Sequence, residues 1–359
     1  MIVQPLNVLV LGASYGLLPG LKLSLAGHKV TFVGRPDEIA AMAAAPVRVD
    51  LPLRRTGSRV VLSASTLVDA APGFPALRTP ATADPHVADF VILAMQEPQF
   101  AAPEIDALVR RIGESRTPCL SIMNLPPPPY LARLGNIPVQ ALSGVYSAQG
   151  AWDAIAPSLL SVTSPDAQAL RLDPSRPGEL TVTLASNFKA APFADPSAQA
   201  LLDRLGRDLS HLKVPFDGGE VRPPVALLAG SSIHAPLAKW PMLIAGNCRC
   251  VTEAEPRSIE AAVHEDLAAA RDIYDRVVEL VHRLGATSAD TVPFAAYARA
   301  ASDLIRPSSL ARALANGVAA VERIDRLVLN LLTIDSGGDN AVQQIVDLID
   351  RKIIENRAK

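Results

Sequence analysis

A short glycine-containing turn near the start of the chain has the residues to bind a phosphate. Gly12 follows an apolar run and Gly16 opens a segment with helical spacing, with Ala13, Ser14 and Tyr15 between them. Gly12 allows a tight turn, Gly16 lets the helix approach the strand, and the free N–H groups of a helix N-terminus attract an anion. A second apolar run at residues 30–33 completes a βαβ unit. The turn is therefore placed where a dinucleotide pyrophosphate would bind.

Arg35 stands at the end of the second apolar run, where the ribose of such a cofactor is recognised. An acidic side chain there would bind the ribose 2′-hydroxyl, whereas a guanidinium suits a 2′-phosphate. Arg35 therefore favours NADP over NAD. Asp37, two residues later, is the opposing signal, and its alternative role is to cap a helix that starts near Glu38.

The first half of the chain alternates apolar runs with segments of helical spacing. Strands are expected at residues 7–12, 29–34, 59–63, 89–95 and 118–123, and helices at 16–26, 37–45 and 102–114. This alternation predicts a mostly parallel, doubly wound sheet of the Rossmann type. Further short strands are expected near residues 138–142 and 179–184.

Apolar residues at three- and four-residue spacing dominate the chain after residue 196. Helices are expected at residues 197–212, 233–250, 258–284, 289–304, 309–332 and 340–356. The fold class is therefore α/β, with a Rossmann-type NADP-binding domain at 1–195 and an all-helical substrate and dimerisation domain at 196–359. A ligand is expected in a cleft between two such domains. A homodimer is expected through an apolar helix face of Val277, Leu280, Val281 and Leu284.

Composition excludes several classes of protein. The 359 residues are 49% hydrophobic and 19% charged, which suits a soluble globular protein with a large core. A net charge of −2 without long runs of one sign argues against nucleic acid or an anionic membrane as partner. No apolar stretch is long enough to span a bilayer. Three cysteines make no disulfide framework, so we expect a cytoplasmic protein, and no metal site is expected.

Five stretches carry a resemblance to one protein family. They are the βαβ unit with Ala-Gly-His-Lys-Val-Thr at 26–31, Val-Ile-Leu-Ala-Met-Gln at 91–96 followed by Gln99, Ser-Ile-Met-Asn at 121–124, Lys-Trp-Pro-Met-Leu-Ile-Ala-Gly-Asn at 239–247, and Pro-Ser-Ser-Leu at 307–310 with Val-Glu-Arg-Ile-Asp at 321–325. In these motifs the chain resembles the ketopantoate reductase (2-dehydropantoate 2-reductase) family. That family belongs to a wider group similar to 6-phosphogluconate dehydrogenase, which pairs a Rossmann domain with a helical domain.

The resemblance implies roles for residues in both halves. Gln96 would lie on the loop that passes the cofactor, and Asn124 would lie beside the nicotinamide and the substrate. The family usually has a glycine after that asparagine, but here Leu125 follows, and then four prolines at 126–129 that we expect to hold the loop extended.

In the helical half, the resemblance implies that Lys239 and Asn247 form the catalytic segment, that Ser309 contacts the substrate carboxylate and that Glu322 is the catalytic acid. Spacings of four and eight predict that positions 239, 243 and 247 share one helix face. The chain departs from the family at Leu243, where an asparagine is usual. Glu322 also falls one residue late, which leaves Asp325 as a rival.

The expected activity is therefore an NADP-dependent reduction of a 2-oxo acid or related carbonyl, with Lys239 as general acid. Asn124, Asn247 and Ser309 would orient the substrate by neutral hydrogen bonds. Two alternatives stay open. One is an opine-type dehydrogenase acting on an imine, and the other is a nucleotide-sensing relative without catalysis, suggested by Ser14 in place of the usual middle glycine.

Overall fold

The computed structural model describes residues 4–13, 15–53, 57–165, 168–230 and 232–359. The chain divides into two compact units. Unit 1 consists of residues 1–95, 100–130 and 150–231, and unit 2 of residues 96–99, 131–149 and 232–359. Within the described ranges, no helix is both long enough and apolar enough to cross a membrane.

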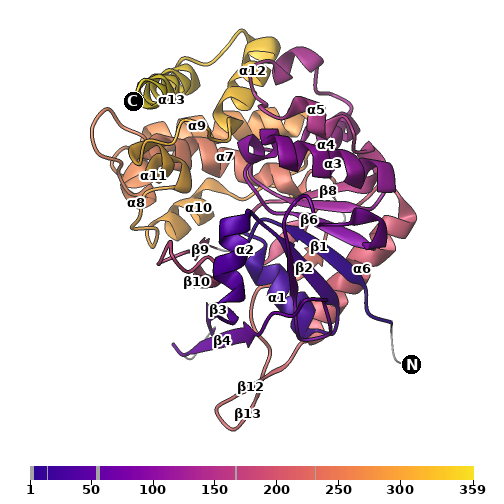
Figure 1. Cartoon of the computed structure of the whole chain (residues 1–359). Helices are drawn as coiled ribbons and strands as arrows, with labels where there is room; N and C mark the ends of the chain where they lie inside the picture. The colour runs from indigo at the N-terminus through magenta and orange to yellow at the C-terminus, as the bar shows by residue number, and fades with distance from the viewer. Residues whose placement is uncertain (1–3, 14, 54–56, 166–167, 231) are drawn as a thin grey trace. The chain divides into compact units, whose positions relative to one another are not determined.

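A six-stranded parallel sheet forms the centre of unit 1 (Figure 1). Its strands in spatial order are β5 (Ala76–Arg78), β2 (Lys29–Val33), β1 (Asn7–Leu11), β6 (Phe90–Leu93), β7 (Cys119–Ile122) and β8 (Leu160–Thr163). Every neighbouring pair is parallel. The order of the strands reverses between β1 and β6, and such a switch point opens a crevice at the carboxyl ends of the strands. The expected doubly wound sheet is confirmed, although β5 and β8 escaped the sequence patterns.

A second sheet of unit 1 corrects one expectation. Its order is β4 (Arg59–Ala64), β3 (Val47–Pro52), β10 (Glu179–Leu184) and β9 (Gln168–Leu170). The strand expected at 59–63 therefore exists, but it pairs antiparallel with β3 outside the Rossmann sheet. Alternate residues of β3 and β4 are buried, as in a sheet with one solvated face, whereas all four residues of β6 are buried.

Helix α1 (Leu17–Leu25) lies between these layers, in contact with β2, β3, β4 and helix α6 (Pro196–His211). Because it is covered on several sides, every residue from 17 to 24 is buried. Helix α6 was expected in the helical domain, yet it packs in unit 1 against β14 (Leu227–Ala229). Compact units are not independently folding domains, so the boundary expected at residue 195 stays a prediction.

The other elements of unit 1 are shorter or lie at its surface. They are α2 (Pro36–Ala43), α3 (Pro103–Ser115), β11 (Phe188–Ala190), β12 (Val214–Phe216) and β13 (Gly219–Val221), with α4 (Pro128–Leu131) and α5 (Gln149–Trp152) at the boundaries between the units. Two local expectations were wrong. The strand expected near 138–142 is a 3₁₀ turn at Val139–Leu142, and Pro128 opens helix α4, so the four prolines do not form one extended loop.

Unit 2 is helical, as expected. Its helices are α7 (Trp240–Met242), α8 (Ile259–His264), α9 (Leu267–Arg283), α10 (Phe294–Ala301), α11 (Ser309–Ala315), α12 (Ile324–Ser336) and α13 (Asn340–Arg357). The helix expected at 258–284 is split because the carboxylate of Asp266 accepts the N–H of Ala269 and starts α9. The expectation that one apolar helix face forms a dimer is wrong. Its residues are all buried within the single chain, namely Val277, Leu280, Val281 and Leu284.

Lys22 is an unusual buried cation on α1. Its side chain is 1% exposed, and Nζ donates to the carbonyl oxygens of Pro223, Pro224 and Val225. Val225 has a φ of +68°, which a β-branched residue rarely adopts. Burial lowers the pKa of Lys22 to about 8. The ammonium is thus held by carbonyl dipoles rather than by a carboxylate.

The depressed pKa of Lys22 predicts an alkaline gain in stability. Between pH 8 and the ordinary lysine pKa of 10.5 the unfolded chain binds more protons than the folded chain, so the free energy of unfolding rises with pH there. From pH 7.5 to pH 10 we expect wild type to gain about 2 kcal/mol relative to Lys22→Met, by urea unfolding. Lys29→Met, at an exposed site on β2, is the control and should run parallel to wild type. If the free energy of unfolding of Lys22→Met changed with pH in parallel with that of wild type, the prediction would be contradicted.

Candidate functional site

The glycine turn after β1 has the geometry that the sequence predicts. Gly12 has a φ of +95°, and its N–H donates to the carbonyl of Val33 at 3.1 Å. A Cβ added to Gly12 would lie 2.5 Å from the carbonyl oxygen of Ala94, which follows β6. Only glycine satisfies both the left-handed backbone and this close approach. The turn therefore sits at the switch point of the parallel sheet, between β1 and β6.

Two further glycines bring α1 onto the strands. A Cβ on Gly16 would lie 2.4 Å from the carbonyl oxygen of Gly12 and 2.5 Å from a methyl of Val10. A Cβ on Gly20 would lie 2.5 Å from the ring of Phe32 on β2. The start of the helix is thus fixed directly above the carboxyl end of β1.

The N-terminus of α1 carries the electrostatic features of an anion site. Gly16 is its N-cap, no side chain of the described residues caps it, and its first turn has no acidic residue. The positive end of the helix dipole is therefore available to a ligand. Ala13 is buried and Tyr15 packs against the core, whereas Ser14 lies outside the described residues. The glycine turn and the start of α1 form a cradle that larger side chains at Gly12 and Gly16 would fill. This cradle fits a dinucleotide pyrophosphate.

Arg35 is exposed at the end of β2 and occupies the N-cap of α2. Its Nε and Nη2 donate to the two carboxylate oxygens of Asp37, each at 3.2 Å. The hydrogen bond from Arg35 lowers the pKa of Asp37. Asp37 does not cap the helix, because α2 begins at Pro36 and has no side-chain cap. The pair is solvated and weakly held, so the guanidinium is free to exchange Asp37 for another anion.

In unit 2, Glu97 connects Gln96 and Glu322, two of the residues expected to form the site. Its N–H donates to Oε1 of Glu322 at 3.3 Å. Its own carboxylate is fully buried and accepts the N–H groups of Ser147 and Ala148, at 2.9 and 2.8 Å. Glu322 is thus held next to Gln96, whose N–H donates to the side chain of Gln99. Glu97 was not expected from the sequence, because a single glutamate after a strand carries no distinctive pattern.

Tyr146 adds a proton donor to this cluster. Burial, together with the carboxylates of Glu97 and Glu322, raises the pKa of Tyr146 well above its usual value of 10. The phenol therefore keeps its proton throughout the ordinary pH range. Sequence spacing gave no reason to group it with Glu322.

The segment that contains Lys239 and Asn247 is not one regular helix. It is a 3₁₀ turn at Ala235–Lys239, then α7, then a π-helical turn at Leu243–Asn247 and a 3₁₀ turn at Cys248–Cys250. The expected single α-helical face for positions 239, 243 and 247 is therefore wrong. Lys239 and Asn247 are half-buried, whereas Leu243 is buried.

Two adjacent serines divide the roles expected at the start of α11. Ser308 is buried and caps the helix by accepting the N–H of Ala311 at 3.2 Å. Its hydroxyl also donates to the main-chain carbonyl of Asn247 at 2.7 Å. Ser309 is the first residue of the helix and is half-buried. The structure thus brings Asn247 and Ser309 close together, and leaves the cap to Ser308.

Asp325, the rival of Glu322, is committed to an internal ion pair. It is fully buried at the start of α12, and Arg323 donates to both of its carboxylate oxygens at 3.1 and 2.8 Å. Arg323 also contacts Asp350 on α13 at 2.7 Å. These bonds give Asp325 a structural role and leave Glu322 as the better candidate acid.

Asn124 belongs to unit 1 and lies two residues beyond the end of β7. It is half-buried, whereas Leu125 is fully buried. Carboxyl ends of parallel strands meet at one edge of a sheet. Asn124 therefore shares that edge with the glycine turn.

Gly16→Ala tests the cradle. The added Cβ meets main-chain atoms of Gly12, which have little room to move, so we expect a loss of about 1–3 kcal/mol in the free energy of unfolding. We also expect dinucleotide affinity to fall at least about tenfold, measured by NADPH fluorescence titration. Gly178→Ala is the matched control, because its Cβ would meet only ordinary contacts at 3.5 Å. Unchanged affinity in Gly16→Ala would count against this site.

No protein-family model matches the chain, and no curated protein sequence matches it. Solved structures nevertheless share its fold. A structure assigned as a ketopantoate reductase, from Ralstonia solanacearum MolK2, has a TM-score of 0.68 at 14% identity and covers 98% of this chain and 99% of its own. D-mandelate dehydrogenase, in a ternary structure with NADH and anilino(oxo)acetate, has a TM-score of 0.63 at 13% identity, covering 98% and 99%.

A dimeric ketopantoate reductase from Staphylococcus aureus has a TM-score of 0.60 at 10% identity and covers 98% of this chain and 100% of its own. At these identities the likeness establishes the architecture. The chain has the fold of the ketopantoate reductases, with a Rossmann-type parallel sheet and a helical C-terminal region, as the resemblance in its motifs implied.

Proposed function

We propose that the protein is an NADP-dependent oxidoreductase that reduces a 2-oxo acid. The observation that carries the proposal is the N-terminus of α1, which no described side chain caps and which Gly12 and Gly16 fix over the switch point. In such sheets this is the position at which a dinucleotide pyrophosphate binds. The fold shared with ketopantoate reductases and with D-mandelate dehydrogenase supports the same class of reaction.

Unit 1 would hold the cofactor. The main chain of residues 12–16 would bind the pyrophosphate, and Asn124 would bind near the nicotinamide. Arg35 would leave Asp37 and pair with the 2′-phosphate, because a phosphate offers a guanidinium two parallel hydrogen bonds and a larger charge. Gln96, which belongs to unit 2, would contact the cofactor from the loop after β6. When bound, the nicotinamide supplies the hydride.

Unit 2 would supply the groups that act on the substrate. The ammonium of Lys239 would donate a hydrogen bond to the substrate carbonyl and pass its proton to the oxygen as negative charge develops there. Asn247 and Ser309 would bind the substrate carboxylate with neutral donors. Glu322 would orient the ammonium or return a proton to it, aided by the N–H of Glu97 that holds its carboxylate.

Homodimer formation and a cytoplasmic location remain part of the proposal. The dimer rests on the dimeric ketopantoate reductase that shares this fold, since the face first expected to pair is buried. The location rests on the three free cysteines, which are all buried thiols.

Lys239→Met tests the general acid. We expect kcat/KM for 2-oxo acids to fall at least about 100-fold, because a positioned acid contributes that much, while the Kd for NADPH stays within about twofold. A panel of 2-oxo acids, with and without amino acids, would also detect an opine-type reaction. Lys213→Met, at an exposed site in unit 1, is the control. Full turnover by Lys239→Met would remove this residue from the mechanism.

Substitutions of Arg35 and of Asp37 should change the affinity for NADPH in opposite directions. Arg35→Gln should weaken NADPH about 10- to 100-fold and leave NADH nearly unchanged, because only NADPH carries the 2′-phosphate. Asp37→Ala should tighten NADPH, since it removes the carboxylate that binds Arg35 at 3.2 Å and leaves the longer contact with Glu38 at 3.9 Å. Both affinities can be measured by fluorescence titration. An equal effect of Arg35→Gln on the two cofactors would reject the preference for NADP.

A further inference from the structure

The π-helical turn at Leu243–Asn247 changes the register of the segment expected to be catalytic. Its hydrogen bonding skips one residue, so the N–H of Cys248 donates to the carbonyl of Leu243. In an α-helix, the same N–H would instead donate to the carbonyl of Ile244. A π turn inserts one extra residue per turn, and such turns are frequent at functional sites. This π turn follows Lys239 in the chain and ends at Asn247.

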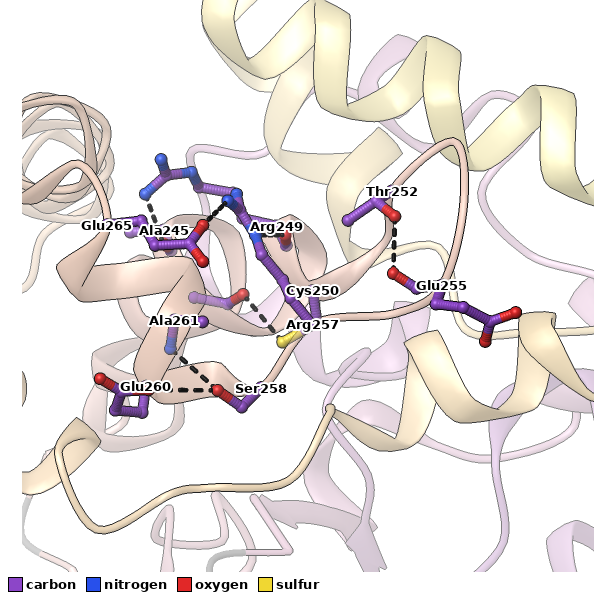
Figure 2. A network of polar contacts seen from close by, with 11 residues as sticks. Ala245, Arg249, Cys250, Thr252, Glu255, Arg257, Ser258, Glu260, Ala261 and Glu265 are labelled. Carbon is purple, nitrogen blue, oxygen red and sulfur yellow. Dashed lines mark hydrogen bonds and ion pairs between the residues drawn. The ribbon is translucent and has the colours of Figure 1, made fainter.

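Side chains bind the carbonyl oxygens in and around this turn. Tyr297 donates to the carbonyl of Met242 at 3.2 Å, and Ser308 donates to that of Asn247 at 2.7 Å. Arg249 also donates to the carbonyl of Ala245, and Figure 2 shows both residues. The thiol of Cys250 donates to the carbonyl of Gly246. Each of these four contacts adds a donor to a carbonyl in or next to the turn, which stabilises the altered register.

Tyr297 and Gly246 fit one another at the centre of the turn. A Cβ added to Gly246 would lie 1.9 Å from the hydroxyl oxygen of Tyr297 and 3.2 Å from its ring. The ring is itself fixed, because Tyr274 stacks on it at 5.3 Å and Phe294 packs edge-on against it. The hydroxyl is therefore held on the carbonyl of Met242, the group that would accept the N–H of Gly246 in a regular helix.

We propose that Tyr297 is a positioning residue, which holds the π turn and thereby sets the side chain of Asn247 relative to Lys239. This inference rests on the proposed function, since it assigns the geometry of the same site. If the turn relaxed to an α-helix, the residues after position 243 would rotate about the axis and shift toward the C-terminal end of the segment. A displacement of about 1 Å in a binding group is enough to reduce turnover severely.

The experiment compares Tyr297→Phe with Tyr274→Phe. Both variants lose one hydroxyl from the same aromatic cluster, but the hydroxyl of Tyr274 donates to Val292, at 2.6 Å, rather than to the π turn. We expect both to lower Tm, and only Tyr297→Phe to lower kcat for the best 2-oxo acid, about 10- to 100-fold. The Kd for NADPH should be unchanged in both. Equal kcat values for the two variants would overturn the inference.

Gly246→Ala and the double variant Gly246→Ala/Tyr297→Phe separate positioning from stability. The single variant should lower Tm strongly, because its Cβ meets the hydroxyl of Tyr297. The double variant should recover most of the lost Tm, because the contact at 1.9 Å is gone and alanine favours the α-helix, although the ring contact at 3.2 Å remains. Its kcat should stay low, since the α-helical register misplaces Asn247. Recovery of kcat together with Tm would overturn the inference.

A crystal structure of Tyr297→Phe gives a readout that does not need activity. Reversion of residues 243–247 to an α-helix supports the inference, and an unchanged π turn contradicts it. A wild-type protein that reduces no 2-oxo acid would overturn the proposed function instead. The Tm cycle and this crystal structure would then still decide whether Tyr297 holds the turn.

Discussion

The close approach of α1 to the parallel sheet is the constraint on which the cofactor half of the molecule depends. Gly12, Gly16 and Gly20 permit it, because a Cβ at any of them would lie within 2.5 Å of a neighbouring atom. The same closeness buries the helix on all sides and forces Lys22 to find carbonyl oxygens in the 223–225 segment. The helix is thus anchored along its length, while its first turn keeps main-chain N–H groups for a ligand.

The two units treat unpaired backbone groups in opposite ways. In unit 1, the start of α1 has no capping side chain among the described residues, which preserves an anion site. In unit 2, hydroxyl, thiol and guanidinium groups bind the carbonyls around the π turn, which leaves that segment one stable register. Cys250 has its explanation here. Its thiol supports the turn, and burial raises its pKa, so it is not disposed to act as a nucleophile.

The sequence could predict features that short patterns encode. Apolar runs located β1, β2, β6 and β7, and the spacing of Gly12 and Gly16 located the cradle. Features that depend on distant residues escaped it. Strand β3 pairs with β10, about 130 residues away, so neither strand alone revealed the second sheet. The π turn has no local sequence signature, because it depends on Tyr297. The role of Glu97 depends on its contact with Glu322, which is 225 residues away in the chain.

The charges around Glu322 limit the forms in which unit 2 can act on an anionic substrate. The N–H groups of Ser147 and Ala148 stabilise the carboxylate of Glu97. The N–H of Glu97 stabilises the carboxylate of Glu322. Burial, together with these two carboxylates, raises the pKa of Tyr146 and keeps it protonated. A 2-oxo acid entering such a region meets repulsion unless a cation compensates for its carboxylate. Of the residues assigned to the substrate, only Lys239 carries positive charge, so in the proposed reaction one ammonium must both attract the acid and protonate its carbonyl oxygen.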